Sequence, residues 1–347
     1  MSGLLEYSGL ATKLKAMGAC LLGSDDYEYL INMTSYEEVI EYLKRHNSYS
    51  IVFGEKKSEG LSRISIEQLL QDTIYMDYKK IYRFASMEQK LFLQTYFVKY
   101  EVAVIKMCLS LCYGHSLEGM GPYSYTGLFE EDMSINIPLL IKSSNMDELI
   151  NNLADTEYYK VLNVLKGRSD STLYDYEILL DIYYYNNLWK SLHKKLSGNE
   201  LRMMKKLYGT QIDLLNMQWI YRAKKYYNIS EADIYALLIP IYYKLRKDTI
   251  KAMVKSGSIS EMESIILGTV YGRLMDTKED EWLSKAYNKT INSLMIKNIR
   301  NNPYSVACIE YYFHRKEKEN ERLIRIIECL RYGKEKETIR KMVYDIK

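Results

Sequence analysis

Residues 142–162 read KSSNMDELINNLADTEYYKVL, and residues 255–271 read KSGSISEMESIILGTVY. Aligned without gaps at one constant offset, the two segments share five identical pairs: Lys142/Lys255, Ser143/Ser256, Glu148/Glu261, Thr156/Thr269 and Tyr158/Tyr271. Conservative pairs continue the match beyond these positions, such as Leu153 opposite Ile266. The match indicates an internal repeat.

Both segments carry the signal for a helix start. Asn145 and Ser258 are residue types that cap helices, and Glu148 and Glu261 stand three residues later, where a carboxylate can return a bond to the cap backbone. Each segment is therefore predicted to begin a short helix. Thr156 and Tyr158, which alone would suggest a modification site, are better interpreted as packing residues of this repeated unit.

A looser third copy is predicted near the N-terminus. Asp25 and Glu28 have the same spacing as the cap pairs, and a Thr-x-Tyr pattern follows at 34–36, as it does at 156–158 and 269–271.

Later features recur in the same order. The pattern Glu-x-Leu opens long periodic segments at 67–69, 177–179 and 281–283, and an acidic residue of a second long helix follows at Glu101, Asp213 and Glu319. The interval between pattern and acid lengthens only slightly from one copy to the next. We therefore predict three helical repeat units of about 110 residues each, with boundaries at 1–114, 115–228 and 229–347.

Composition favours the same all-α class. The 347 residues include only 4 prolines and 17 glycines, and β-sandwiches and barrels need more turn residues than this. The net charge is +3 with no run of five like charges, so binding of nucleic acid by bulk charge is not expected. The alternating Lys, Arg and Glu residues of 314–341 predict a solvated helix face.

No segment has the features of a membrane span. The longest stretches without Asp, Glu, Lys or Arg, 107–117 and 119–129, are 11 residues long, whereas a span needs about 20. Glu6, Lys13 and Lys15 interrupt any signal-peptide apolar region. We expect a soluble, cytoplasmic chain with no direct membrane span.

No metal site is predicted. Five cysteines fit free thiols of a reducing compartment. Cys108, Cys112 and His115 stand about one helical turn apart, but thiols in the apolar run MCLSLCYG are more often core residues, and no second pair supplies a fourth ligand.

Catalytic and cofactor-binding motifs are also not found. There is no Gly-x-x-x-x-Gly-Lys-Ser/Thr loop, and Gly119 and Gly121, before Pro122, most simply mark a connector. The four histidines share no motif. Asp213 and Asn216 are best interpreted as partners in structural hydrogen bonds between helices. We therefore predict no catalytic, cofactor-binding or metal-binding residue, and no enzyme activity of the chain's own.

Tyrosine is unusually frequent, with 35 residues. A tyrosine can bury its ring and hydrate its hydroxyl, so we expect helix faces that are packed at the ring and wet at the tip. Clusters such as IYYYNNLW at 182–189 lack basic neighbours, which argues against a base-stacking surface.

The repeated segments, in this order, resemble the C subunit family of V-type (A/V-type) rotary ATPases and ATP synthases, whose eukaryotic counterpart is the d subunit. The similarity covers essentially the whole chain and rests on three motifs. These are Lys13, Lys15, Ala16 and Met17; Asp213, Asn216, Arg222 and Lys224; and Lys316, Glu317 and Glu319. Val104 and Arg322 depart from it, where an Asn is often found, as does Ile241, where a Gly is common.

The resemblance implies an all-α funnel of three similar helical domains around a pseudo-threefold axis. It implies a non-catalytic central-stalk subunit, placed between the shaft subunits D and F and the membrane proteolipid ring, which transmits torque for proton or sodium transport. Two alternatives remain from the residues themselves. One is a generic α-helical scaffold unrelated to rotary ATPases, and the other is a helical enzyme that uses the Cys108–His115 region.

Overall fold

A computed structural model describes residues 2–113, 133–168, 171–227, 229–277 and 281–344. Within these ranges the regular elements are all helices and no strand is present, so the predicted all-α class is confirmed. Among the described helices, none is both long enough and apolar enough to span a bilayer. The connector predicted at Gly119 and Gly121, and His115, lie outside the described residues.

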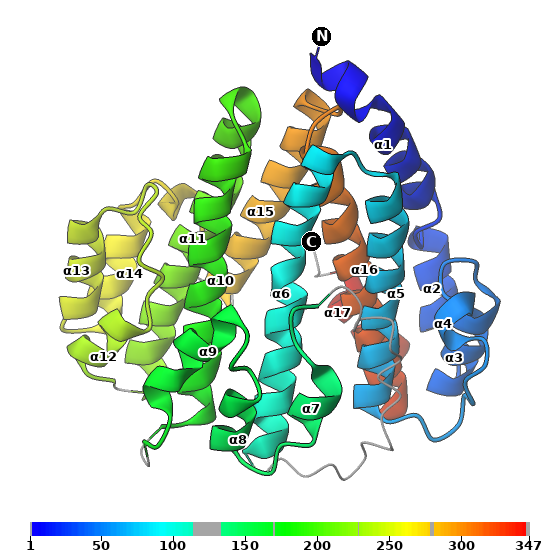
Figure 1. The fold of residues 1–347 in the computed structure, drawn as a ribbon, viewed down its shortest axis with the longest axis horizontal. Helices are drawn as coiled ribbons and strands as arrows, with labels where there is room; N and C mark the ends of the chain where they lie inside the picture. Colours follow the sequence, from blue (N-terminus) through cyan, green and yellow to red (C-terminus); the bar gives the residue numbers. More distant parts are fainter. Residues whose placement is uncertain (1, 114–132, 169–170, 228, 278–280, 345–347) are drawn as a thin grey trace. The chain divides into compact units, whose positions relative to one another are not determined.

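Long helices alternate with groups of short ones (Figure 1). The long helices are α1 (Ser2–Ala19), α5 (Arg63–Phe84), α6 (Met87–Cys112), α10 (Leu173–Lys195), α11 (Gly198–Arg222), α15 (Trp282–Asn301) and α16 (Ala307–Arg331). The short ones are α2 (Ser24–Ile31), α3 (Tyr36–Arg45), α4 (Ser50–Phe53), α7 (Ile137–Ile141), α8 (Met146–Asn151), α9 (Glu157–Leu162), α12 (Glu231–Ala236), α13 (Lys247–Lys255), α14 (Ile259–Leu267) and α17 (Lys336–Tyr344). Single turns η1 (Asn163–Leu165), η2 (Ala223–Tyr227) and η3 (Gly272–Leu274) complete the set.

The chain forms two compact units, which are described separately. Of the described residues, unit 1 contains 2–93 and 299–344, and unit 2 contains 94–113, 133–168, 171–227, 229–277 and 281–298. The division at 1–114, 115–228 and 229–347 stays a prediction. What recurs along the chain is a set of local motifs, the helix caps and the buried carboxylates that bind the capped segments.

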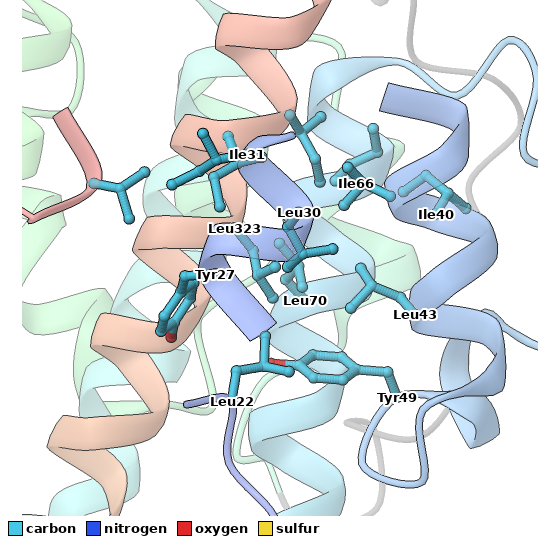
Figure 2. Close-up of a cluster of buried hydrophobic side chains, with 14 of the residues drawn as sticks. Leu22, Tyr27, Leu30, Ile31, Ile40, Leu43, Tyr49, Ile66, Leu70 and Leu323 are labelled. Carbon is cyan, nitrogen blue, oxygen red and sulfur yellow. The ribbon is translucent and has the colours of Figure 1, made fainter. Parts of the chain in front are cut away.

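In unit 1 the two ends of the chain share one core. Helix α16 packs against α1, α3, α5 and α17, and α17 packs against α2. Figure 2 shows Leu323 of α16 among apolar side chains from the N-terminal helices, including Leu30 and Leu70. Each such fully buried aliphatic side chain contributes about 1.5–3 kcal/mol. At the edge of this core, Arg340 of α17 pairs with Glu28 of α2 at 2.9 Å.

In unit 2, helix α10 packs against α9 and α11, and α11 packs against α13 and α14. One apolar cluster joins α11, α12, α13, α14 and the start of α15 through residues such as Met217, Ile250, Met262 and Trp282. The short helices are thereby fixed on the side of a long one.

The prediction of a solvated face over 314–341 is wrong for part of α16. Lys316 is completely buried, and Glu319 and Asn320 are 2% and 5% exposed. The two charged groups tolerate burial because Lys316 donates to Glu319 at 2.8 Å. The side-chain NH₂ of Asn320 donates to the Leu70 carbonyl at 2.6 Å.

Candidate functional site

The predicted helix caps are present in both copies of the repeat. The Asn145 side chain accepts a bond from the Glu148 N–H at 2.9 Å, and Ser258 accepts one from the Glu261 N–H at 3.1 Å. The two glutamates return bonds to the residue before the cap rather than to the cap itself. Glu148 accepts from Ser144 at 2.8 Å, and Glu261 accepts from Gly257 at 2.7 Å.

The third cap lies about ten residues later than predicted. Ser35 caps α3 by accepting a bond from the Glu38 N–H, and Glu38 accepts from the Thr34 N–H at 2.8 Å. Glu28, the predicted partner, binds Arg340 instead. The Thr-Ser pair at 34–35 is therefore the cap itself, not the end of the capped helix.

Each capped segment is held by a buried carboxylate from the middle of a long helix. We call this arrangement a carboxylate clip: a buried acidic side chain that accepts hydrogen bonds from a backbone N–H and from a tyrosine hydroxyl of one short-helix segment. The three clips are centred on Glu101 of α6, Asp213 of α11 and Glu319 of α16, the acids that the sequence pattern singled out.

The Asp213 clip has the most donors. The Asp213 carboxylate accepts the N–H groups of Tyr243, Lys244 and Leu245 at 3.1, 2.7 and 2.9 Å. The Tyr271 hydroxyl donates to it at 2.7 Å. Asp213 is 1% exposed and Tyr271 is 4% exposed, so these bonds fix the turn before α13 and the end of the α14 segment against α11 inside the protein.

The Glu101 clip has the same plan. Ser134 donates its N–H to Glu101 at 2.6 Å and its hydroxyl at 3.1 Å. The Tyr158 hydroxyl donates at 2.5 Å. The Tyr158 ring is buried against Tyr183, at 5.2 Å between centroids. The prediction that Tyr158 is a packing residue is confirmed.

The Glu319 clip joins the two ends of the chain and adds a cation. The Leu22 N–H donates to Glu319 at 2.5 Å, and the Tyr49 hydroxyl donates to the same carboxylate. Lys316, one helical turn earlier on α16, donates to it at 2.8 Å, and its ammonium lies 3.9 Å from the centre of the Tyr49 ring.

Burial controls the protonation of these groups. Desolvation raises the pKa of Asp213, and its hydrogen bonds to three backbone N–H groups and to Tyr271 oppose that rise. Desolvation, followed by the neighbouring carboxylate, raises the pKa of Tyr49, Tyr158 and Tyr271 well above 10. At neutral pH these tyrosines are donors, and none is poised to act as a base.

The tyrosines of the clips follow the caps at nearly constant spacing. Tyr158 and Tyr271 follow the caps Asn145 and Ser258 at the same interval, whereas Tyr49 stands one residue farther from its cap, Ser35. Their hydroxyls bind carboxylates rather than water, so the expectation of hydrated tips is wrong for all three. The one-residue insertion hides Tyr49 from an ungapped search.

Two further residues of the resemblance have structural partners. Asn216 donates to the Ile239 carbonyl and accepts from its N–H, both at 3.0 Å, so the predicted structural hydrogen bond is confirmed. Lys224 donates to the Val254 carbonyl at 2.7 Å. Both contacts join α11 and the turn after it to the segments that the Asp213 clip holds.

The cysteine cluster is part of the packing. Cys108 is fully buried, and burial raises the pKa of its thiol to about 12, which keeps it protonated. Cys112 donates to the Ser143 carbonyl at 3.3 Å. Among the residues that the structure describes, no group of three His, Cys, Asp or Glu side chains is placed to hold a metal ion.

Comparison with known proteins identifies the family. The sequence model of the ATP synthase (C/AC39) subunit family matches residues 10–342. The chain belongs to this family.

Curated relatives agree with the family match. The C subunit of the A-type ATP synthase of Methanosphaera stadtmanae is 26% identical over 88% of this chain and 79% of its own length. The corresponding protein of Pyrococcus abyssi is 24% identical over 98% of this chain and 90% of its own length. That of Methanocaldococcus jannaschii is 23% identical over 80% and 69%.

Family membership sets the functional class. The C/AC39 chain is a subunit of a rotary ATP synthase or ATPase and not one of the subunits that carry its catalytic sites. Lys316 and Glu319 in unit 1, and Asp213 and Asn216 in unit 2, are buried and form structural hydrogen bonds within their own units.

Proposed function

We propose that this chain is the central-stalk socket of its rotary complex. In this role it links the shaft subunits D and F to the membrane proteolipid ring, is peripheral to the membrane through that complex, and transmits torque for proton or sodium transport. Three similar helical units, arranged as a funnel, would form the socket. The observation that carries the proposal is the family match over residues 10–342.

The clips support a mechanical role. A part that passes torque must resist shear between its helices, and a buried carboxylate with three or more donors fixes two segments in both distance and direction. Three such clips recur, each at the middle of a long helix.

Helical stiffness supports the same role. Residues 282–301 and 307–331 are two long helices separated by only a short turn, and the 4 prolines of the chain leave few places where a helix can kink. A socket also needs broad contacts, since stable assemblies commonly bury about 2,000 Å² or more.

Co-purification tests the assignment. A tagged chain, recovered from gently solubilised membranes of its own cells, is expected to bring down subunits D and F together with the proteolipid. A low-resolution image of the same particles should place it between shaft and ring. Removing the chain should abolish ATP-driven ion pumping while the detached head still hydrolyses ATP.

Two results would contradict the assignment. Recovery of the chain alone, without D, F or proteolipid, would favour the generic scaffold. Loss of ATP hydrolysis by an isolated head that lacks this subunit would show that the chain takes part in catalysis. The triple variant Cys108→Ala, Cys112→Ser, His115→Ala should leave ion pumping nearly intact if the protein folds. Loss of ion pumping in a folded variant would favour the helical enzyme.

A further inference from the structure

A groove in unit 1 runs between α1 and α16. It is lined at helical spacing by Ala11, Leu14, Lys15 and Gly18 of α1 and by Cys308, Tyr311, Tyr312 and Arg315 of α16, and Ala19, Ile299 and Pro303 complete the lining. The groove has a volume of about 380 Å³. Because both stripes follow the spacing i, i+3, i+4, i+7, they present two straight ridges with a trough between them.

The two helices lie side by side in the same direction. A Cβ atom built on Gly18 would stand 3.2 Å from the Arg315 guanidinium, and the Leu22 N–H bonds Glu319. Both pairs are 297 residues apart in the sequence, so the helices stay in register. The small Gly18 is what lets the Arg315 side chain lie close to α1.

The floor of the groove is apolar and its rim is basic. Leu14 and Cys308 are 4% and 5% exposed. Tyr312, which also lies in the floor, already donates its hydroxyl to Asp77 at 2.6 Å. Lys15 and Arg315 are exposed, and within the described residues neither has an acidic partner; each only lies 5.9 Å from a tyrosine ring, Tyr304 and Tyr311 respectively.

This anatomy fits a protein partner better than a small molecule. A small-molecule pocket places a few polar groups inside to orient its ligand. Here the charges stand on the rim, around an apolar centre with tyrosine and arginine, which is the pattern of a protein interface. A trough between two parallel helices is also a natural seat for a third helix.

We propose that this groove docks a helix of a neighbouring subunit of the rotary complex, a helix with an apolar stripe flanked by carboxylates. Its apolar side chains fill the trough, and its carboxylates pair with Lys15 and Arg315. The inference rests on the proposed function, because it requires a neighbouring subunit. It also gives a role to Lys15 of the basic N-terminal motif, which the clips do not use.

Zero-length crosslinking tests the contact directly. A carbodiimide joins a lysine amine to a carboxylate that touches it, with loss of water from the two groups. In the purified complex, the Lys15 amine is expected to couple to an Asp or Glu in a helical peptide of another subunit, detected by mass spectrometry. The Lys15→Arg variant keeps the charge but has no amine that a carbodiimide can couple, so this crosslink should be lost in it.

Charge reversal tests the energetics. The double variant Lys15→Glu, Arg315→Glu is expected to lower recovery of the partner subunit about tenfold or more at low salt and to flatten the salt dependence of assembly. The matched control is Lys57→Glu, Lys334→Glu, which changes the charge of unit 1 equally at two exposed lysines for which no ion pair is found in the described residues. Circular dichroism should show both variants folded. Reversing the crosslinked acid to Lys in the partner should restore binding.

The outcomes separate the two proposals. If the unchanged chain brings down no D, F or proteolipid, the proposed function fails. If it brings them down, but the double reversal behaves like its control and Lys15 forms no crosslink between subunits, only the groove assignment fails. A Lys15 crosslink to a second copy of this chain, or charge-dependent binding to anionic lipid vesicles with normal assembly, would also overturn it.

Discussion

The Asp213 clip and the Glu319 clip hold equivalent segments with different chemistry. Asp213 accepts four bonds from neutral donors, three backbone N–H groups and Tyr271. Glu319 accepts from one backbone N–H, from Tyr49 and from the ammonium of Lys316. Three residues before the acid, where the Glu319 clip has Lys316, the Asp213 clip has Thr210.

The two clips also differ in what they connect. Asp213 binds a turn about 30 residues away in the chain, whereas Glu319 binds Leu22, 297 residues away. Loop closure grows with the logarithm of loop length, so the longer closure costs about 2 kcal/mol more. In the Glu319 clip, Lys316 adds a charge-assisted hydrogen bond to the carboxylate. The contact between the two ends of the chain therefore depends on the charges of both Lys316 and Glu319.

The largest effect on stability should come from removing one charge of the Lys316–Glu319 pair. Lys316→Met leaves the buried Glu319 without its cation, and we expect a loss of about 3–5 kcal/mol in the free energy of unfolding. Denaturant unfolding measures it. The double variant Lys316→Met, Glu319→Gln should recover part of the loss, and the exposed Lys334→Met should change stability by less than about 0.5 kcal/mol. A single variant no worse than this control would show that the ion pair does not hold the junction.

The next effect should come from the clip that has no cation. Asn at position 213 keeps the size of Asp but turns an amide NH₂ toward buried N–H donors, so Asp213→Asn should cost about 3 kcal/mol in the same measurement. Thr210→Val tests the position that Lys316 occupies in the Glu319 clip. Because Thr210 is not a charge partner of Asp213, this variant should lower the free energy of unfolding by only about 1 kcal/mol. Equal costs for Thr210→Val and Lys316→Met would remove the distinction between the clips.

The tyrosines should make the protein sensitive to alkali. Because the pKa of Tyr271 is raised in the folded state, the unfolded chain loses that proton first, and stability falls as pH rises above about 10. Tyr271→Phe should cost about 2 kcal/mol at pH 8 and make the decline above pH 10 less steep. Absorbance at 295 nm, measured as a function of pH, reports the ionisation of the tyrosines. Denaturant unfolding over the same pH range measures the cost of Tyr271→Phe and the decline in stability. Ionisation of Tyr49, Tyr158 and Tyr271 near pH 10 in the folded protein would contradict their burial.

The smallest effects should come from the caps. Glu38→Ala, Glu148→Ala and Glu261→Ala each remove one return bond to a backbone N–H, and each should cost about 0.5–2 kcal/mol. The control is Glu157→Ala, at an exposed carboxylate whose pair with Lys160 is 3.6 Å long. The costs of Glu148→Ala and Glu261→Ala should be alike, and Glu38→Ala should cost at least as much because Glu38 also accepts the Thr34 hydroxyl at 2.9 Å. A Glu38 variant indistinguishable from the control would remove α3 from the repeat.

The sequence predicted the parts of each clip better than their assembly. Glu101, Asp213 and Glu319 were identified by order and spacing alone, as were the caps at Asn145 and Ser258. The partner of Glu319 could not be identified in this way. Tyr49 is displaced by one residue from the repeat, and Asp25 and Glu28 imitate a cap because acidic residues are common at helix starts for several reasons.

Local signals in this chain determined the helices, their caps and the acids that recur along it, because hydrophobic period, cap residues and breakers act over a few residues. Tertiary structure alone decided which N–H each acid accepts, why the Lys316 ammonium is buried among apolar helices, and that helices from the two ends of the chain, α2, α3, α16 and α17, share one core. Those results depend on contacts between residues about 30 positions apart for Glu101 and Asp213, and 297 apart for Glu319. The charge pattern of a helix is the same whether the helix is solvated or enclosed.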